Sequence, residues 1–283
     1  RHLILDSGGL AAVTGPAALL IDQSFIWRRG TVHELRSLTT QIESQTTFEN
    51  TGKSVLSGTD WKIIGDVTGD SNVNLELANG ATINVEYAGR WYQSTGGTIS
   101  QGLGDTGSFN VIGEFHKTDE GAFVVQTPFS CSGTLNLAEG TLTVQGDFNL
   151  EESGVITGGG TADLTYNRRL ILIDAPSAVM RGTIRPGLGD GAYARMDIQG
   201  VVDLESTFHI ELDVVTAGEF NTESVYFLTG GQVFGGTLEL MVQQPATPGV
   251  DYRVIYSNVA SGEFIVTGDD QFDEVIQAGI GVV

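Results

Sequence analysis

Apolar and polar residues alternate along much of the chain, in short runs of five to seven residues. The clearest runs are Val73–Leu77, Ala81–Tyr87, Thr141–Gln145 and Phe208–Val214. Successive side chains of a strand point to opposite sides, so period-two alternation gives a strand one apolar and one polar face. Each run therefore predicts a half-buried β-strand.

Turn signals rich in glycine and asparagine separate these runs. They are Asn50-Thr51-Gly52, Asn79-Gly80, Gly96-Gly97, Gly158-Gly159-Gly160, Gly230-Gly231 and Gly235-Gly236. No window of eleven or more residues shows the 3.6-residue spacing of an amphipathic helix. The pattern predicts an all-β chain.

An internal repeat favours a solenoid over a sandwich of two sheets. The segment Gly97–Asp105 recurs later in the chain as Gly182–Asp190, and each copy opens with Gly-Thr-Ile. The separation of the two copies predicts three coils of about 28 residues, within the usual range for solenoid repeats. We expect glycine to take the tight corner with a positive φ, and the following β-branched threonine to restart a strand. Weaker Gly-Thr copies start at Gly133, Gly140 and Gly236, and another starts at Gly80 with one residue inserted.

The resulting prediction is a right-handed parallel β-helix (β-solenoid) that forms one domain over residues 1–283. We expect an N-terminal strand or cap segment at 1–30, main coils at 31–200 and terminal coils at 201–283. Alternation in the central coils predicts which side chains fill the interior and which face outward. The interior set is Leu135, Leu137, Leu142, Val144, Phe148 and Ile156, and the outward set is Asn136, Thr143 and Gln145.

The charge balance excludes several classes of partner. With 14 Lys and Arg against 35 Asp and Glu, the formal net charge is −21. Nucleic-acid phosphates and anionic membrane surfaces both require a basic footprint, so we expect neither as a partner. The acidic surface suits a soluble particle that resists aggregation, and divalent cations are the remaining candidate ligands.

Several segments resemble a family of secreted bacterial proteins. These are Ser132–Leu137, Gly140–Val144, Gly154–Ile156 and Gly182–Gly187, followed by Gly236–Leu240, Asp251–Ile255 and Gly262–Phe264. They resemble autotransporter passenger domains and filamentous-haemagglutinin-like β-helices, over roughly residues 45–265. The resemblance implies a right-handed parallel β-helix at the cell surface or outside a bacterial cell, acting as an adhesin, a stalk or a biofilm component.

The densest polar stretch is Glu114–Glu120, which includes His116, Lys117 and Asp119. It could supply the acid, base and cation that cleavage of a polysaccharide requires. A charge run is more often a solvated surface, and we interpret this one as a loop between coils.

Two metal-binding hypotheses fail on ligand spacing. The run Asp66–Asn74 superficially resembles a calcium loop, but counting from Asp66 it has Thr68, Ser71 and Leu77 where that loop needs a ligand, a glycine and a bidentate carboxylate. An Asp/Asn/Gly turn fits better. The four histidines share no metal-ligand spacing, and His209 should face solvent because it alternates with apolar neighbours. They are His2, His33, His116 and His209.

Aromatic residues and the single cysteine complete the candidates. Trp27, Trp61, Trp91 and Tyr92 could form a platform that stacks on sugars, or they could be packing residues, which is the more common role. Cys131 has no partner for an intrachain disulfide and no adjacent basic group, so we expect a small buried side chain.

The sequence therefore predicts a non-enzymatic extracellular structural or adhesive module. We expect no catalytic, cofactor-binding or metal-binding residues, and no membrane insertion by this segment. Self-association into head-to-tail filaments and a cell-surface or glycan receptor are the partners considered. The largely apolar segment His2–Ile26 and the uncharged tail after Glu274 suggest that neither end is capped. The alternative function is a carbohydrate-active β-helix enzyme, either a polysaccharide lyase or a hydrolase.

Overall fold

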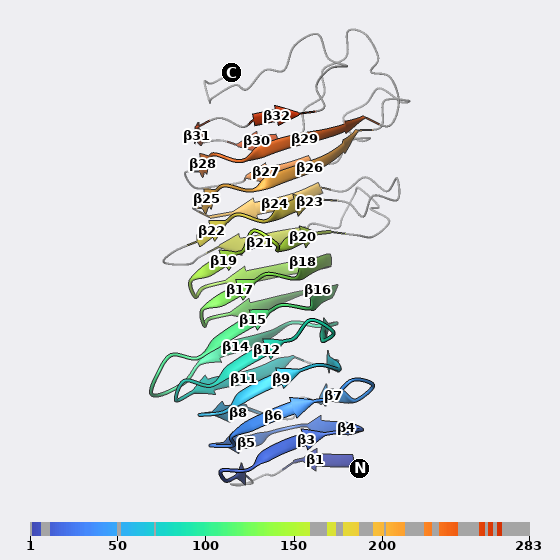
Figure 1. The fold of residues 1–283 in the computed structure, drawn as a ribbon, viewed down its shortest axis with the longest axis vertical. Coiled ribbons are helices and arrows are strands. Elements are labelled where there is room, and N and C mark those ends of the chain that lie inside the picture. Colours follow the sequence, from blue (N-terminus) through green and yellow to red (C-terminus); the bar gives the residue numbers. More distant parts are fainter. Residues whose placement is uncertain are drawn as a thin grey trace.

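The chain folds into a parallel β-solenoid, as the alternation and the repeat predict. The computed structural model describes residues 2–6, 12–49, 52–70, 72–158, 169–173, 178–186, 195–200, 202–212, 224–227, 232–242, 255–257, 260–262 and 265–267. Every strand pairing within these ranges is parallel, and each coil stacks on the one before it. Strand β1 (His2–Leu5) lies at one end of the elongated stack and β32 (Ile265–Thr267) at the other (Figure 1).

Each coil contributes strands to three faces. The first face contains β1, β4 (Ser24–Trp27), β7 (Gln45–Phe48), β10 (Asp66–Gly69), β13 (Arg90–Gln93), β20 (Val155–Thr157), β23 (Thr183–Arg185), β26 (Thr207–Leu212), β29 (Thr237–Val242) and β32. The second face contains β2 (Ala12–Thr14), β5 (Gly30–His33), β8 (Ser54–Ser57), β11 (Val73–Ala78), β14 (Gly97–Gln101), β21 (Arg169–Ile173), β24 (Arg195–Gln199), β27 (Ser224–Phe227) and β30 (Ile255–Ser257).

The third face is a separate sheet of 11 strands. It contains β3 (Ala18–Ile21), β6 (Ser37–Thr40), β9 (Asp60–Ile63), β12 (Thr82–Val85), β15 (Ser108–Val111), β17 (Phe129–Cys131), β19 (Phe148–Leu150), β22 (Ala178–Met180), β25 (Val202–Leu204), β28 (Gln232–Phe234) and β31 (Ala260–Gly262). The first and second faces form one sheet because two long strands, β16 (Glu114–Val125) and β18 (Thr134–Val144), run across the corner between them.

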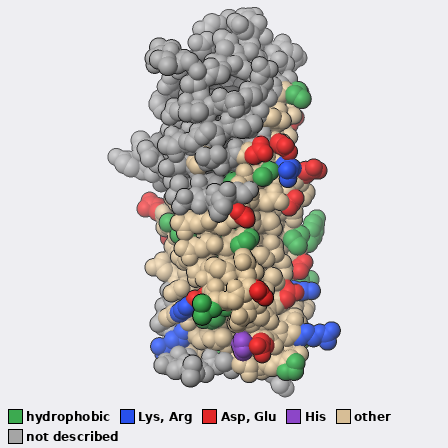
Figure 2. Space-filling model, turned by 90° about the vertical axis from the view of Figure 1, so that its left-hand side faces the viewer, with side chains coloured by type: hydrophobic (Ala, Val, Ile, Leu, Met, Phe, Trp, Pro, Cys, Tyr) green, Lys and Arg blue, Asp and Glu red, His purple; other side chains and the backbone are tan. Residues whose placement is uncertain are grey.

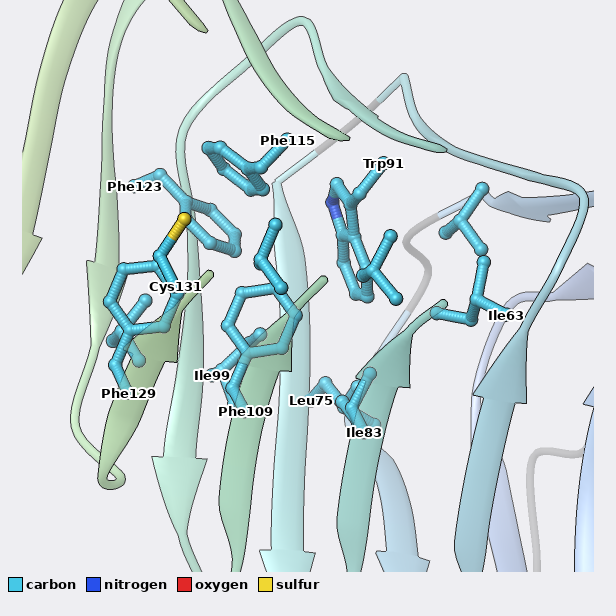
Figure 3. Close-up of a cluster of buried hydrophobic side chains, with 14 of the residues drawn as sticks. Ile63, Leu75, Ile83, Trp91, Ile99, Phe109, Phe115, Phe123, Phe129 and Cys131 are labelled. Carbon is cyan, nitrogen blue, oxygen red and sulfur yellow. The ribbon is translucent and has the colours of Figure 1, made fainter. Parts of the chain in front are cut away.

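The interior is a continuous apolar ladder. Leu135, Leu137, Leu142, Val144, Phe148 and Ile156 are all buried, as predicted. Figure 3 shows side chains from all three faces converging in the centre of the coil, among them Trp91, Phe109, Phe115 and Phe129. Burial of this apolar surface is the main stabilising contribution to the fold.

Two predictions of side-chain position differ from the structure, one outward and one inward. Asn136 and Gln145 are partly exposed, as expected, but Thr143 is only 7% exposed. Thr143 is paired in register with residues of the coils on both sides, and a short side chain in the middle of a stacked face is covered by its neighbours. The alternating run that was predicted to extend to Tyr87 ends as a strand at Val85, and Tyr87 lies in the next turn with 89% of its surface exposed.

The coils differ in length, although the repeat predicted a constant one. Val67 pairs with Trp91 of the next coil, whereas Phe109 pairs with Phe129, so the second of these coils is the shorter. The two copies of the repeat also lie on different faces, because Gly97 begins β14 on the second face and Gly182 precedes β23 on the first. The Gly-Thr pair therefore marks corners that lead into different faces. Because the turns differ in length, the number of residues between equivalent positions of successive coils is not constant.

The glycines of these corners serve two different purposes. Gly80 and Gly140 have the predicted positive φ, 71° and 80°. At Gly133 the cause is instead a close approach, since an added Cβ would lie 2.1 Å from the carbonyl oxygen of Gly113 in the preceding coil. Stacking at the spacing of paired strands leaves no room there for a side chain.

Candidate functional site

The polar stretch Glu114–Glu120 is part of a strand, and its interpretation as a loop between coils is wrong. It forms the first half of β16, which pairs with β13 below and β18 above. The register shifts after Lys117 and again before Ala122, so the strand bulges at the corner and leaves Asp119 and Glu120 exposed. The alternation of apolar and polar residues is hard to recognise in this part of the sequence, because an inward position holds a lysine and is therefore polar like its outward neighbours.

His116 is the centre of a polar cluster on the first face. Its Nε2 lies 2.8 Å from Oε2 of Glu114, and its ring stacks on Tyr92 with centroids 4.9 Å apart. Arg90 Nε lies 3.5 Å from the same Glu114 oxygen, and Asn136 Nδ2 lies 3.4 Å from His116 Nδ1. These contacts fix the imidazole between neighbouring coils, so the cluster stabilises a ladder of outward side chains.

Lys117 points into the core, which the sequence reasoning missed. Its side chain is fully buried, and Nζ donates a hydrogen bond to the carbonyl oxygen of Asp119. Burial lowers the pKa of Lys117, and the negative charges of Asp119 and Glu139 oppose this shift in part. In the coil below, Gln93 is buried in the same way and donates to the carbonyl oxygens of Thr95 and Gly96, each at 3.1 Å. Both side chains therefore satisfy backbone groups at the corner.

The tryptophans form part of the core, so the packing interpretation is confirmed and the sugar platform is wrong for them. Trp27, Trp61 and Trp91 are fully buried, and Trp91 lies 6.2 Å from Trp61 and 5.4 Å from Phe109, measured between ring centroids. Tyr92 is the exception, since it is partly exposed and stacks on His116 as described above.

The described histidines do not lie together as a metal site would require. His2 Nδ1 lies 2.5 Å from Ser24 Oγ on the first face, whereas His33 Nδ1 lies 3.0 Å from Ser57 Oγ on the second face. The side chain of His209 lies outside the described residues. In the part of the chain that is described, no three His, Cys, Asp or Glu side chains are grouped in a way that could hold a metal ion.

The segment around Asp66 is more regular than the Asp/Asn/Gly turn proposed for it. Asp66–Gly69 is strand β10, and β11 begins at Val73, so only a short connection joins the two faces. Cys131 matches its prediction, because it is fully buried in the interior and burial raises the pKa of its thiol to about 12.

An open groove lies along the corner between the third face and the first face. The corner turns differ in length: residues 86–89 and 151–154 form four-residue connections, whereas 112–113 and 132–133 form two-residue connections. Two short corners between two longer ones leave a hollow two coils wide. This groove has a volume of about 780 Å³ and is lined by Asn84, Asn110, Ile112, Ser130, Ser132, Glu151, Glu152, Ser153 and Arg181.

The floor of the groove is a chain of hydrogen bonds that runs from coil to coil. Ser130 Oγ donates to Asn110 Oδ1 at 2.9 Å, and Asn110 Nδ2 donates to Asn84 Oδ1 at 2.8 Å. Asn84 Nδ2 then donates to Asp60 Oδ1 at 2.6 Å, so the chain ends on a carboxylate. All its donors point one way, and such chains strengthen one another by polarisation.

Charged residues bound the groove at one end. Glu151 Oε1 accepts a hydrogen bond from Asn149 at 2.5 Å, and Arg181 Nε donates to Glu205 Oε2 at 2.9 Å. Glu151 and Glu152 come from the same turn, and both line the groove. The sequence reasoning missed the groove, because it depends on turn lengths that can be compared only when the strand ends are known.

The surface carries no dense basic region on the side shown in Figure 2, as far as the described residues go. Uncharged polar groups and backbone predominate there, with acidic side chains dispersed among a few basic ones. No helix long and apolar enough to cross a membrane occurs in the described ranges. Comparison of the chain with protein-family models, with curated proteins and with solved structures finds no match to any of them.

Proposed function

We propose that this protein is a non-enzymatic structural or adhesive module at the surface of a bacterial cell or outside it. The observation that carries the proposal is the single interior cluster of apolar side chains, whose members range from Leu5 to Leu238 along an elongated stack of coils (Figure 1). Such a rod holds its outer surface at fixed positions along one axis. Extracellular location is supported by the acidic surface and by the resemblance to secreted β-helices.

Head-to-tail assembly belongs to the same proposal. Strand β1 pairs with β4 along one edge, and no other described strand pairs with its second edge. An unpaired edge can accept a strand from another copy, and contact between unlike ends propagates a filament when it does not close on itself.

Electron microscopy of the purified chain, combined with light scattering over a range of concentrations, tests both statements. We expect rods of uniform width that lengthen with concentration. Compact globular particles would contradict the rod, and a chain that stays monomeric at high concentration would contradict the filament.

A carbohydrate-active enzyme is the second candidate, favoured by the His116–Glu114 contact and by the carboxylates in the groove. Glycoside cleavage needs two carboxyl groups that flank the bond. Glu151 and Glu152 both line the groove, whereas His116 lies on the first face, so a glycosidase at the groove would draw both of its carboxyl groups from one turn.

We expect no release of reducing ends or unsaturated products from acidic or neutral polysaccharides. Turnover that disappears in His116→Ala or Asp119→Ala would establish the enzyme instead. Turnover that survives both of these changes but disappears in Glu151→Gln would place the reaction in the groove.

A further inference from the structure

The groove between the turns at 86–89 and 151–154 presents hydrogen-bond acceptors in a regular row. The hydroxyl hydrogen of Ser130 is used by Asn110, so its oxygen remains an acceptor for a ligand. Each amide oxygen of Asn110 and Asn84 receives one hydrogen bond from the ladder and keeps a second lone pair. These oxygens repeat at the spacing of stacked strands, roughly 4.8 Å.

Charge selects the kind of ligand further. Glu151 and Glu152 add carboxylate acceptors, and the guanidinium of Arg181 is already paired with Glu205. The whole chain has a net charge of −21, so a polyanion would be repelled. A ligand that suits this row must be rich in donors and carry no negative charge, and sugar hydroxyl groups have this character.

Apolar side chains provide the other half of a carbohydrate site. Ile112 lies in the groove with 41% of its surface exposed. Sugar rings have an apolar face that packs against aromatic and aliphatic side chains. The groove is open along the corner, so a polymer can pass through without its ends being enclosed.

We propose that this groove binds a neutral glycan chain, with its hydroxyl groups on Asn84, Asn110 and Ser130 and a ring packed on Ile112. The inference deepens the proposed adhesive function and rests on it. The receptor class is thereby a neutral polysaccharide, bound along the axis of the rod and not cleaved.

Ser132→Gln is the variant that blocks the groove with the least risk to folding. Ser132 follows β17 directly in a two-residue connection, and the same position in two other two-residue connections holds Ile64 and Ile112, so a longer side chain is compatible with this corner. Ile64→Gln is the matched control, because Ile64 holds the same position after β9 and does not line the groove.

The experiment measures binding of cellohexaose, maltohexaose and chitohexaose to the full chain by calorimetry, with hexagalacturonate as an acidic comparison. We expect at least one neutral hexasaccharide to bind, Ser132→Gln to abolish that binding, and Ile64→Gln to leave it unchanged. Ile112→Ala should weaken it roughly three- to tenfold through loss of an apolar contact with the sugar ring.

Two results would overturn the inference: no neutral hexasaccharide binds, whether or not hexagalacturonate does, or Ser132→Gln binds as well as the parent chain. Circular dichroism of each variant shows whether the solenoid is intact. If the protein assembles into rods, binds no glycan and cleaves none, only the proposal that the groove binds a glycan is refuted. Cleavage of any hexasaccharide would instead refute the proposed non-enzymatic function.

Discussion

Lys117 makes the stability of this solenoid depend on pH in the alkaline range. Burial lowers the pKa of Lys117 below its ordinary value of 10.5, and its side chain is fully buried. Between the folded and the unfolded pKa, the unfolded chain binds more protons than the native one. The contribution of Lys117 to stability therefore rises with pH across this window and is lost as pH falls through it. The raised pKa of Cys131 acts in the opposite direction, since it lowers stability as pH rises above the thiol's ordinary value of 9.0, so the contribution of Lys117 is measured as the difference between the parent chain and a Lys117 variant.

The magnitude has a defined ceiling. One proton taken up only by the unfolded state gives a slope of at most about 1.4 kcal/mol per pH unit. Lys117→Met shortens the side chain by one atom and removes the charge, so the contribution of Lys117 to the slope should disappear. At neutral pH the substitution spares a desolvated ammonium but loses the bond to the carbonyl oxygen of Asp119. We expect a net gain of roughly 1 kcal/mol.

Urea unfolding followed by tryptophan fluorescence from about pH 6 to about pH 10 measures both quantities. Lys62→Met is the matched control, because the side chain of Lys62 is 48% exposed and its loss should leave the slope of the parent chain intact. An equal slope in the parent chain and in Lys117→Met would refute the reasoning, since the alkaline gain would then come from other groups.

Other predictions follow from burial and close approach. Trp91→Ala should destabilise the fold by about 3–5 kcal/mol in urea unfolding, whereas the adjacent outward Tyr92→Ala should cost less than about 1.5 kcal/mol; equal losses would contradict the inward position of Trp91. Gly133→Ala should cost roughly 1–3 kcal/mol or more, because its Cβ would lie 2.1 Å from a backbone oxygen, while Gly52→Ala, which meets only a side chain at 3.3 Å, should be tolerated. Cys131 should react with Ellman's reagent only after unfolding, and rapid labelling of the native chain would show that its thiol is accessible.

Much of the fold was predictable from local pattern. Alternation in Val73–Leu77 and around Leu142 correctly assigned inward residues, because the side-chain period of a strand is two in any sheet. Parallel stacking was predictable from repeated corners, since a glycine followed by a β-branched residue signals a turn into a strand.

The alternation of apolar and polar residues did not predict burial where a polar residue occupied an inward position. Lys117 and Gln93 were not recognised as buried, because sequence alone does not show that a nearby backbone carbonyl will accept their hydrogen bonds. The prediction for Tyr87 was wrong in the opposite sense. Its apolar ring continued the alternation in the sequence, but the strand ends at Val85 and Tyr87 is exposed.

The sequence by itself determined the strands, the all-β class and most of the interior, because these depend on the order of neighbouring residues. Only the tertiary structure decided which corners are adjacent, and hence where the groove lies. Asn84, Asn110 and Ser130 belong to three successive coils of unequal length, and strand pairing brings them into one row. The physical reason is that stacking depends on hydrogen bonds between coils, which align paired strands whatever length of chain lies between them.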